Sequence, residues 1–196
     1  MRKTGVVAAA IIAVCGAAAA EPADWSGPYV GLVVSNEGGD QQYFDNDVPR
    51  PGPTFPTYLS GTTSGAFAGY NFQNGALVYG IEAEKTSGSV AYGPFPDNRH
   101  SDFTEARVRA GYAAGKVLFY GAVGVSSSTW VENTVDEISA EGQSFALGID
   151  AQLGQNMLLG VEEMRRNLDS ENFNVAPQAR FEGSFDSVRL RLGVRF

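Results

Sequence analysis

The sequence predicts an all-β protein: an eight-stranded antiparallel up-and-down transmembrane β-barrel, with short turns at one end and long loops at the other. Two observations carry this prediction. Eight segments alternate between apolar and polar residues, which is the period of a strand with two different faces. The connections between them are alternately long and short, beginning and ending with a long one. The 24 glycines and the scarcity of helix-favouring runs also favour strands.

The N-terminal residues have the order of a secretory signal peptide. Two basic residues open the chain, an apolar run covers residues 5–14, and small residues follow at 16–20, as in a cleaved signal. The apolar run is shorter than the roughly 18 residues that a transmembrane helix needs. We predict cleavage after Ala20, so that residues 1–20 are a signal peptide and residues 21–196 form a single barrel domain.

Composition excludes several kinds of partner and chemistry. The chain contains 14 Lys and Arg against 22 Asp and Glu, and its formal net charge of −8 argues against nucleic acid as a partner. Its single cysteine, Cys15, lies in the predicted signal, so the mature domain has neither disulfides nor thiol chemistry. No metal-ligand cluster or cofactor motif stands out in the sequence, and we expect no cofactor.

The eight strands follow the alternation along the chain. The short connections are rich in glycine and asparagine, and Asn74-Gly75 in the first of them is a strong hairpin signal. The long connections are polar, which places all short turns at one end of the sheet. Closing the sheet removes its edges and satisfies every backbone group within a membrane. The predicted strands cover residues 28–35, 62–73, 76–86, 103–113, 117–130, 143–153, 156–168 and 183–196, and the long loops cover 36–61, 87–102, 131–142 and 169–182.

The last strand shows the two faces most clearly. From Val188 to Phe196 every even position is apolar, and the odd positions hold three arginines and a glycine. We take the apolar side of each strand to face lipid and the other side to face the interior. Eight strands leave room inside for side chains only, and buried charges are tolerated when they are paired. The predicted interior charge network consists of Glu82, Glu84, Glu105, Arg107, Arg109, Asp150, Glu162, Arg189, Arg191 and Arg195.

Aromatic residues on the apolar side gather near the short turns. At this position they would meet the lipid headgroups, as the aromatic girdle of a membrane barrel does. The predicted girdle consists of Tyr70, Phe72, Tyr112 and Phe196.

The seventh strand departs from the pattern. Strict alternation directs Glu163 and Arg165 toward lipid, at a cost of about 2–4 kcal/mol for a basic group at the midplane and less near the interface. Either a β-bulge changes the parity, so that Met164 faces outward, or this stretch already lies among the headgroups. The sequence leaves both alternatives open.

Several stretches carry a resemblance to a known family. Residues 25–31 (WSGPYVG), residues 69–75 (GYNFQNG) followed by 79–82 (YGIE), and the terminal Phe196 resemble the small eight-stranded outer-membrane barrels of Gram-negative bacteria. These are the OmpA-like and opacity-protein-like group, with its short porin-like members. The resemblance implies a place in the cell outer membrane, with the short turns in the periplasm and the long loops outside the cell.

The same resemblance implies partners. Outer-membrane lipid and lipopolysaccharide would surround the barrel, and the barrel-assembly machinery would read the last strand. The predicted assembly signal consists of Leu190, Leu192, Val194 and Phe196.

The predicted function is a structural, surface-exposed envelope role. Acidic residues in two long loops suggest binding of divalent cations or of surface ligands. Since eight strands leave a filled interior, we expect at most a narrow or gated pore. The acidic residues are Glu37, Asp40, Asp45 and Asp47 in the first loop and Glu132, Asp136, Glu137 and Glu141 in the third.

Two alternatives stay open at this point. A soluble periplasmic β-barrel would turn the same apolar face inward and bind a small apolar ligand. A lipid-modifying enzyme would need a catalytic group, and the only histidine, His100, lies in the second predicted loop beside Ser101 and Asp102. Side chains two apart in an extended strand share a face, so His100 could pair with Asp102 but not with Ser101. We predict that the protein is not an enzyme.

Overall fold

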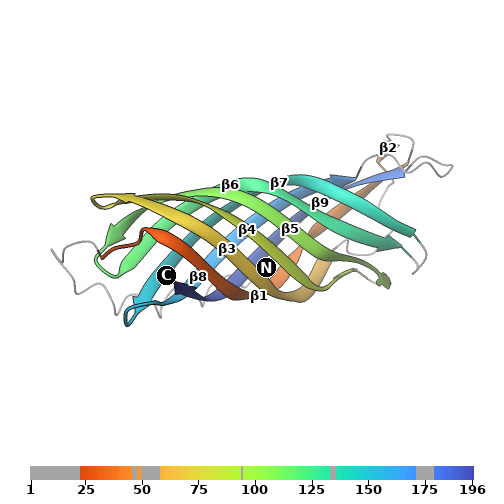
Figure 1. Cartoon of the computed structure of the whole chain (residues 1–196). Coiled ribbons are helices and arrows are strands. Elements are labelled where there is room, and N and C mark those ends of the chain that lie inside the picture. Colours follow the sequence, from red (N-terminus) through yellow and green to blue (C-terminus); the bar gives the residue numbers. More distant parts are fainter. Residues whose placement is uncertain (1–22, 46–47, 50–57, 94, 133–135, 171–178) are drawn as a thin grey trace, which may run out of the picture.

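The chain forms one closed antiparallel barrel (Figure 1). The computed structural model describes residues 23–45, 48–49, 58–93, 95–132, 136–170 and 179–196, and the predicted signal peptide lies outside them. Eight long strands pair with their sequence neighbours, and the last closes on the first; the two-residue β2 adds to the end of β1. The strands are β1 (Gly27–Asp45), β2 (Val48–Pro49), β3 (Tyr58–Asn74), β4 (Leu77–Tyr92), β5 (Phe95–Ala114), β6 (Val117–Glu132), β7 (Asp136–Leu153), β8 (Met157–Ser170) and β9 (Ala179–Arg195).

The eight barrel strands are longer than the sequence predicts. They run for 14 to 20 residues, whereas about 9–11 tilted residues cross a bilayer. Most of the predicted loops 87–102 and 131–142 belong to strands, so these loop boundaries are wrong. The physical reason is that backbone pairing continues after the apolar alternation has ended, because polar side chains also suit a strand whose outer face meets water.

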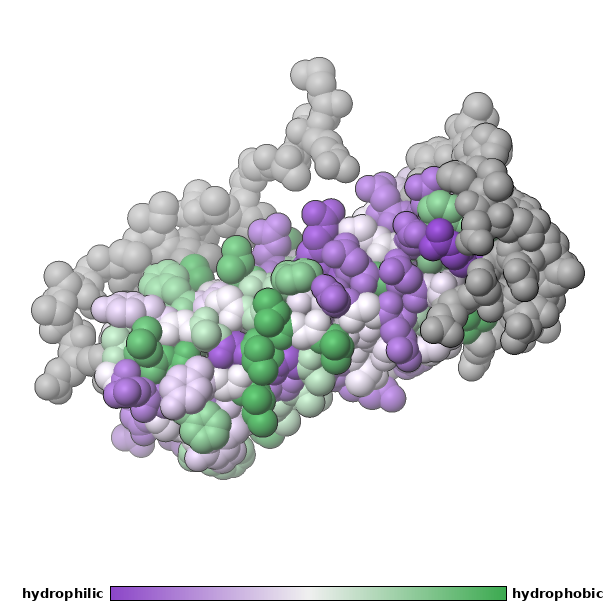
Figure 2. All heavy atoms as spheres, turned by 90° about the horizontal axis from the view of Figure 1, so that it is seen from above, coloured by the Kyte–Doolittle hydropathy of each residue, from purple (hydrophilic) through white to green (hydrophobic). Residues whose placement is uncertain are grey.

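A belt of apolar side chains surrounds the half of the barrel that carries the short turns. Figure 2 shows hydrophobic residues mainly over this half and hydrophilic residues toward the opposite, distal end. Among the described residues, no helix is long and apolar enough to cross a membrane. The belt residues are exposed, and those with large side chains include Val30, Leu32, Val34, Tyr79, Ile81, Val108, Phe119, Val123, Val125, Phe145, Leu147, Leu153, Met157, Leu159, Leu190, Leu192 and Val194.

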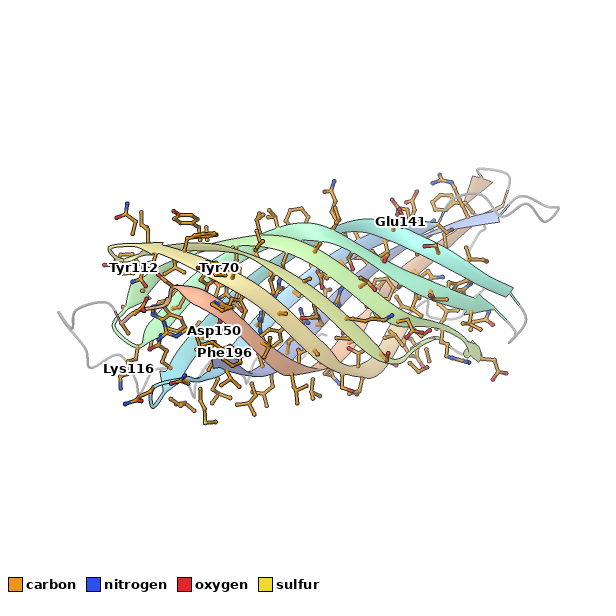
Figure 3. All side chains as sticks on the ribbon, in the orientation of Figure 1. Tyr70, Tyr112, Lys116, Glu141, Asp150 and Phe196 are labelled. Atoms are coloured by element: carbon orange, nitrogen blue, oxygen red, sulfur yellow. The ribbon has the colours of Figure 1, made fainter. Side chains whose placement is uncertain are left out.

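The predicted girdle residues all lie on the outside of the barrel. Tyr70, Phe72, Tyr112 and Phe196 are exposed, and Figure 3 shows Tyr70, Tyr112 and Phe196 at the short-turn end. The rings of Tyr70 and Phe72 pack with their centroids 4.8 Å apart. The four residues of the predicted assembly signal are exposed as well; three of them lie on β9, and Phe196 follows this strand directly.

The interior consists of a charged layer between two apolar clusters. The proximal cluster lies near the short turns and the distal cluster near the other end, so the described side chains fill the lumen along its length. The proximal cluster is Trp25, Tyr29, Val33, Phe67, Val78, Ala113, Leu118, Tyr120 and Leu158, and the distal cluster is Leu59, Val90, Tyr92, Phe103, Trp130, Ala140, Leu168, Phe181 and Phe185.

A β-bulge in β5 brings His100 into the distal cluster. The pairing of β5 with β6 shifts between Ser101 and Thr104, and Asp102 has a φ of 52°, a left-handed conformation that asparagine and aspartate tolerate. One extra residue reverses the parity, so both Phe103 and His100 are buried. The prediction of a loop histidine is therefore wrong.

The same bulge separates His100 from Asp102, the pair that the enzyme alternative would need. Asp102 is exposed and accepts hydrogen bonds from the hydroxyls of Ser87 at 3.0 Å and Ser101 at 3.1 Å. It lies on the opposite face from buried His100. The pairing of His100 with Asp102 that the enzyme alternative allowed is therefore not formed.

Strand β8 contains no bulge. Its pairing with β7 and β9 is continuous, and burial alternates through residues 162–170. Met164 is buried, while Glu163 and Arg165 lie on the outer face. The alternative in which Met164 turns outward is therefore wrong.

Candidate functional site in the barrel interior

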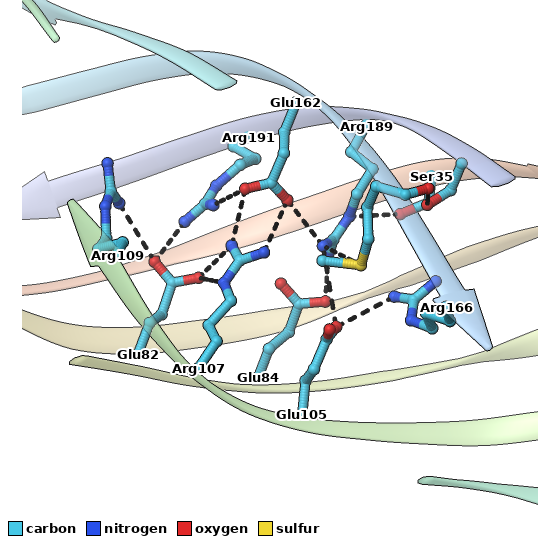
Figure 4. Close-up of polar contacts among 12 residues, drawn as sticks. Ser35, Glu82, Glu84, Glu105, Arg107, Arg109, Glu162, Arg166, Arg189 and Arg191 are labelled. Atoms are coloured by element: carbon cyan, nitrogen blue, oxygen red, sulfur yellow. Dashed lines mark hydrogen bonds and ion pairs between the residues drawn. The ribbon is translucent and has the colours of Figure 1, made fainter. Parts of the chain in front are cut away.

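Glu82 lies at the centre of the proximal part of the charge network (Figure 4). Its Oε1 accepts hydrogen bonds from Arg107 Nε at 3.0 Å and Nη2 at 2.5 Å. Its Oε2 accepts hydrogen bonds from Arg191 Nη2 at 2.6 Å and Tyr29 OH at 2.8 Å, and Arg109 Nη1 lies 3.4 Å from the same oxygen. One carboxylate of β4 thereby joins β1, β5 and β9.

Glu162 of β8 forms the second centre. Its Oε1 accepts hydrogen bonds from Arg107 Nη1 at 3.0 Å and Arg189 Nη1 at 2.8 Å. Its Oε2 accepts them from Arg191 Nη1 and Tyr120 OH, both at 2.8 Å. Arg107 and Arg191 therefore each bind two carboxylates, which the planar fork of a guanidinium allows.

Arg166 extends the network toward the distal end. Its Nη1 lies 3.2 Å from Glu37 Oε2, and its Nη2 lies 3.3 Å from Glu105 Oε2. Arg189 Nη2 pairs with Glu84 Oε1. These pairs link β8 to β1 and β5, and β9 to β4.

Aromatic rings and a further carboxylate hold the proximal end of the network. Arg109 Nη2 lies 2.7 Å from Asp150 Oδ2, and its guanidinium carbon lies 3.8 Å from the centroid of the Tyr120 ring. The guanidinium of Arg191 lies 4.2 Å from the centroid of the Phe67 ring. Such cation–π contacts stabilise a desolvated arginine and tie the charges to the proximal cluster.

Nine of the ten predicted interior charges are at most 5% exposed. The tenth, Arg195, is partly exposed and pairs at 3.5 Å with Asp24 Oδ2, apart from the network at the short-turn end. Sequence reasoning missed Glu37 and Arg166, although both are at most 2% exposed. In β1 and β8, inward and outward side chains continue to alternate beyond the last apolar residues of the outer face. This pattern is the signal that would have identified both residues.

The network holds six carboxyl and five guanidinium side chains. The carboxyl oxygens Glu84 Oε2 and Glu105 Oε1 have no hydrogen-bond partner in the described part of the chain. The ion pairs between charged side chains cross-link six strands of the barrel, β1, β4, β5, β7, β8 and β9, and the hydroxyl of Tyr120 adds β6. Chemically this arrangement fills and braces the lumen.

His100 occupies a separate polar site within the distal cluster. Its Nε2 lies 2.8 Å from Gln41 Oε1 and its Nδ1 lies 3.0 Å from Ser128 Oγ, so Nε2 donates and the Ser128 hydroxyl donates to Nδ1. The imidazole packs against the rings of Trp130 and Phe185, with centroids 4.6 and 4.7 Å away. The site lies distal to the apolar belt, and burial lowers the pKa of His100 to about 3.

Most residues of the two acidic loops that the sequence predicts belong to strands. Glu37 is buried in the network, which corrects its prediction as a surface residue, because it continues the inward parity of β1. Asp40 and Glu141 are exposed on β1 and β7. Within the described residues, no three acidic, histidine or cysteine side chains are arranged to hold a metal ion. Asp47 and the side chains of Asp45, Glu132, Asp136 and Glu137 lie outside the described part.

Comparison with known proteins agrees with the fold and with the outer-membrane location. The family described as outer membrane protein beta-barrel domain matches residues 6–196. A 22 kDa outer membrane protein of Rhizobium leguminosarum bv. viciae is 26% identical over 178 residues, 88% of this chain and 78% of that protein. A 25 kDa outer-membrane immunogenic protein of Brucella abortus is 27% identical over 143 residues, which span 68% of this chain and 64% of the Brucella protein.

A solved structure shares the fold. The solid-state NMR structure of the outer membrane protein AlkL in lipid bilayers aligns with a TM-score of 0.55, at 14% identity, over 91% of this chain and 95% of that one. With the family match, the closed barrel and the apolar belt, the lipid-facing assignment of the apolar side holds, and the soluble periplasmic alternative is excluded. The chain belongs to the family of outer-membrane β-barrel proteins.

Proposed function

We propose that the protein is a structural component of the outer membrane whose barrel projects from the bilayer and presents a polar surface outside the cell. The observation that carries this proposal is the length of the barrel strands, which continue past the apolar belt as a paired, polar-faced extension. The name of the Brucella relative, an outer-membrane immunogenic protein, supports surface exposure.

Surface exposure predicts selective labelling of cysteine variants on intact cells. Glu141 and Lys116 are both exposed and lie at opposite ends of the barrel (Figure 3). The only native cysteine lies in the predicted signal, so after cleavage the introduced cysteine is the single thiol that the reagent can label. A membrane-impermeant maleimide should label Glu141→Cys on intact cells and should label Lys116→Cys only after the outer membrane is permeabilised. Equal labelling of both variants on intact cells would refute the proposed orientation.

We also propose that the resting barrel is closed. Two apolar clusters and the charged layer occupy the lumen, and buried, paired side chains of this kind leave no aqueous path. In planar bilayers, the purified full-length barrel should show no steady conductance above the bare-membrane level. A porin from the same preparation procedure serves as the positive control, and a large, sustained conductance would overturn the closed state.

We further propose that the protein is not an enzyme. Its named relatives are outer membrane proteins. His100, with its hydrogen-bond partners Gln41 and Ser128, is buried among aromatic rings, so a substrate has no access to it. Asp102, the acid that the enzyme alternative would need, lies on the opposite face of the strand. This burial supports a structural role for the histidine.

A further inference from the structure

The segment before β1 crosses the mouth of the barrel at the short-turn end. We call this segment, residues 23–26, the strap; it lies outside the strands. The backbone N–H of Ala23 donates to the carbonyl oxygen of Gly115 at 3.2 Å, in the turn between β5 and β6. In the closed order of the eight long strands this turn lies opposite β1. The strap therefore spans the mouth from one side to the other.

Two glutamine side chains hold the backbone of the strap. Oε1 of Gln73, at the end of β3, accepts a hydrogen bond from the N–H of Trp25 at 2.6 Å, and its Nε2 donates to the carbonyl oxygen of Ala23 at 3.1 Å. Nε2 of Gln152, on β7, donates to the carbonyl oxygen of Asp24 at 2.7 Å. These contacts come from side chains and not from the strand ladder. The strap can therefore leave the mouth without breaking any strand pairing.

The strap carries one large ring into the lumen. The side chain of Trp25 belongs to the proximal cluster and is buried, with an exposed fraction of 1%. Its Nε1 donates to the carbonyl oxygen of Gly115 at 3.3 Å, so the polar atom of the indole has a partner. The other members of the cluster come from six strands, β1, β3, β4, β5, β6 and β8. The barrel strands thus build a pocket, and the strap fills it.

A glycine joins the strap to β1. Gly27 has a φ of 111°, which residues with a Cβ rarely adopt, and this conformation turns the chain from the strand into the mouth. At the rim, Arg195 Nη1 donates to the carbonyl oxygen of Ser26 at 3.3 Å and lies 3.5 Å from Asp24 Oδ2. The side chain of Asp24 is 72% exposed, and exposed ion pairs are weak. The strap therefore has a flexible joint and a weak fastening at the rim.

We propose that the strap is a latch on this mouth. When it is docked, Trp25 fills a preformed pocket in the proximal cluster; when it is undocked, the pocket opens to water. The barrel stays folded in both states, because strand pairing begins at Gly27. The charged layer still fills the lumen, so the open latch admits small molecules to the pocket but not through the barrel. The inference is independent of the surface role proposed for the distal half.

Thiol labelling of the mature barrel in detergent micelles tests the latch. Leu118 in the proximal cluster and Val90 in the distal cluster are both 0% exposed. A cysteine at either position therefore reports opening of its own part of the lumen to a small methanethiosulfonate reagent. The native Cys15 lies in the predicted signal, so it does not contribute. Mobility on gels without boiling shows that each variant is folded.

The variant Gln73→Ala removes two hydrogen bonds to the strap and leaves the proximal cluster intact. It should accelerate labelling of Leu118→Cys by about thirtyfold, the worth of two hydrogen bonds. Labelling of Val90→Cys should not change. The matched control is Gln155→Ala in the turn between β7 and β8. In the described part of the chain Gln155 has no hydrogen bond to the strap, so this variant should change neither rate.

The variant Trp25→Ala tests whether the pocket is preformed. It removes the ring, so labelling of Leu118→Cys should again be faster than in the unmodified strap. Apolar cavities left by truncation bind small apolar molecules, and added indole should therefore slow this labelling by about fivefold or more. Indole should have no effect while Trp25 occupies the pocket. If Trp25→Ala does not fold, Trp25→Leu, which keeps part of the apolar volume, replaces it.

Three results would overturn the proposal. Unchanged labelling of Leu118→Cys in the Gln73→Ala background would show that the strap is a fixed part of the core. Equal acceleration at Val90→Cys would show that the substitution loosens the whole barrel. Failure of indole to protect the folded Trp25→Ala variant would show that the pocket collapses without its ring. Labelling on intact cells tests the surface role separately, so the two proposals can fail independently.

Discussion

Replacement of Arg191 with alanine is expected to lower the free energy of unfolding of the barrel by about 3–5 kcal/mol. Its guanidinium binds Glu82 at 2.6 Å and Glu162 at 2.8 Å, and its side chain is only 2% exposed. The variant leaves both carboxylates without one of their buried counter-charges, and the cost of an uncompensated buried charge far exceeds the worth of the pair itself. Equilibrium unfolding by urea, with the barrel in detergent micelles, measures the difference.

Arg165 provides the matched control. It also forms an ion pair with a carboxylate, Asp186, at 3.2 Å, but both partners are more than half exposed. Arg165→Ala should therefore change the free energy of unfolding by no more than about 1 kcal/mol. If Arg191→Ala proves no more destabilising than Arg165→Ala, then the interior network does not brace the barrel.

Acid is expected to destabilise the distal end of the barrel through His100. Burial lowers the pKa of His100 to about 3, below its ordinary value of about 6.5 in the unfolded chain. Between these two values the unfolded chain binds the extra proton, so the free energy of unfolding falls as the pH decreases. The loss approaches about 1.4 kcal/mol per pH unit below 6.5, or about 2 kcal/mol at pH 5.

The variant His100→Gln isolates this contribution. Glutamine does not titrate, and the polar neighbours of the imidazole, Gln41 and Ser128, are neutral. Unfolding midpoints measured from pH 7.5 to pH 4 should fall less steeply in His100→Gln than in the unmodified barrel. The difference between the two slopes should correspond to one proton taken up on unfolding. Parallel pH profiles for the two proteins would show that His100 is not held in its neutral form.

The membrane-spanning half of the barrel is predictable from the sequence because lipid imposes a strict pattern. Each strand there must present apolar side chains on alternate positions, as Leu190, Leu192 and Val194 do, and narrow lumens must pair their charges. The same rule placed Arg191 and Glu162 inside. The first short turn is equally local, although its two residues are Gly75 and Ala76: Asn74 is still paired with Leu77, and Gly75 has a φ of 62°.

The sequence by itself determined the number of barrel strands, the lipid-facing side and most members of the charge network. Tertiary structure alone decided which arginine binds which carboxylate, because pairing depends on the stagger between strands. It also decided the inward position of His100, through the bulge at Asp102. Distal to the belt, the outer face meets water and needs no hydrophobic pattern. Backbone pairing between strands therefore sets the strand ends there, and the sequence does not show this pairing. The same pairing brings Glu37 to Arg166.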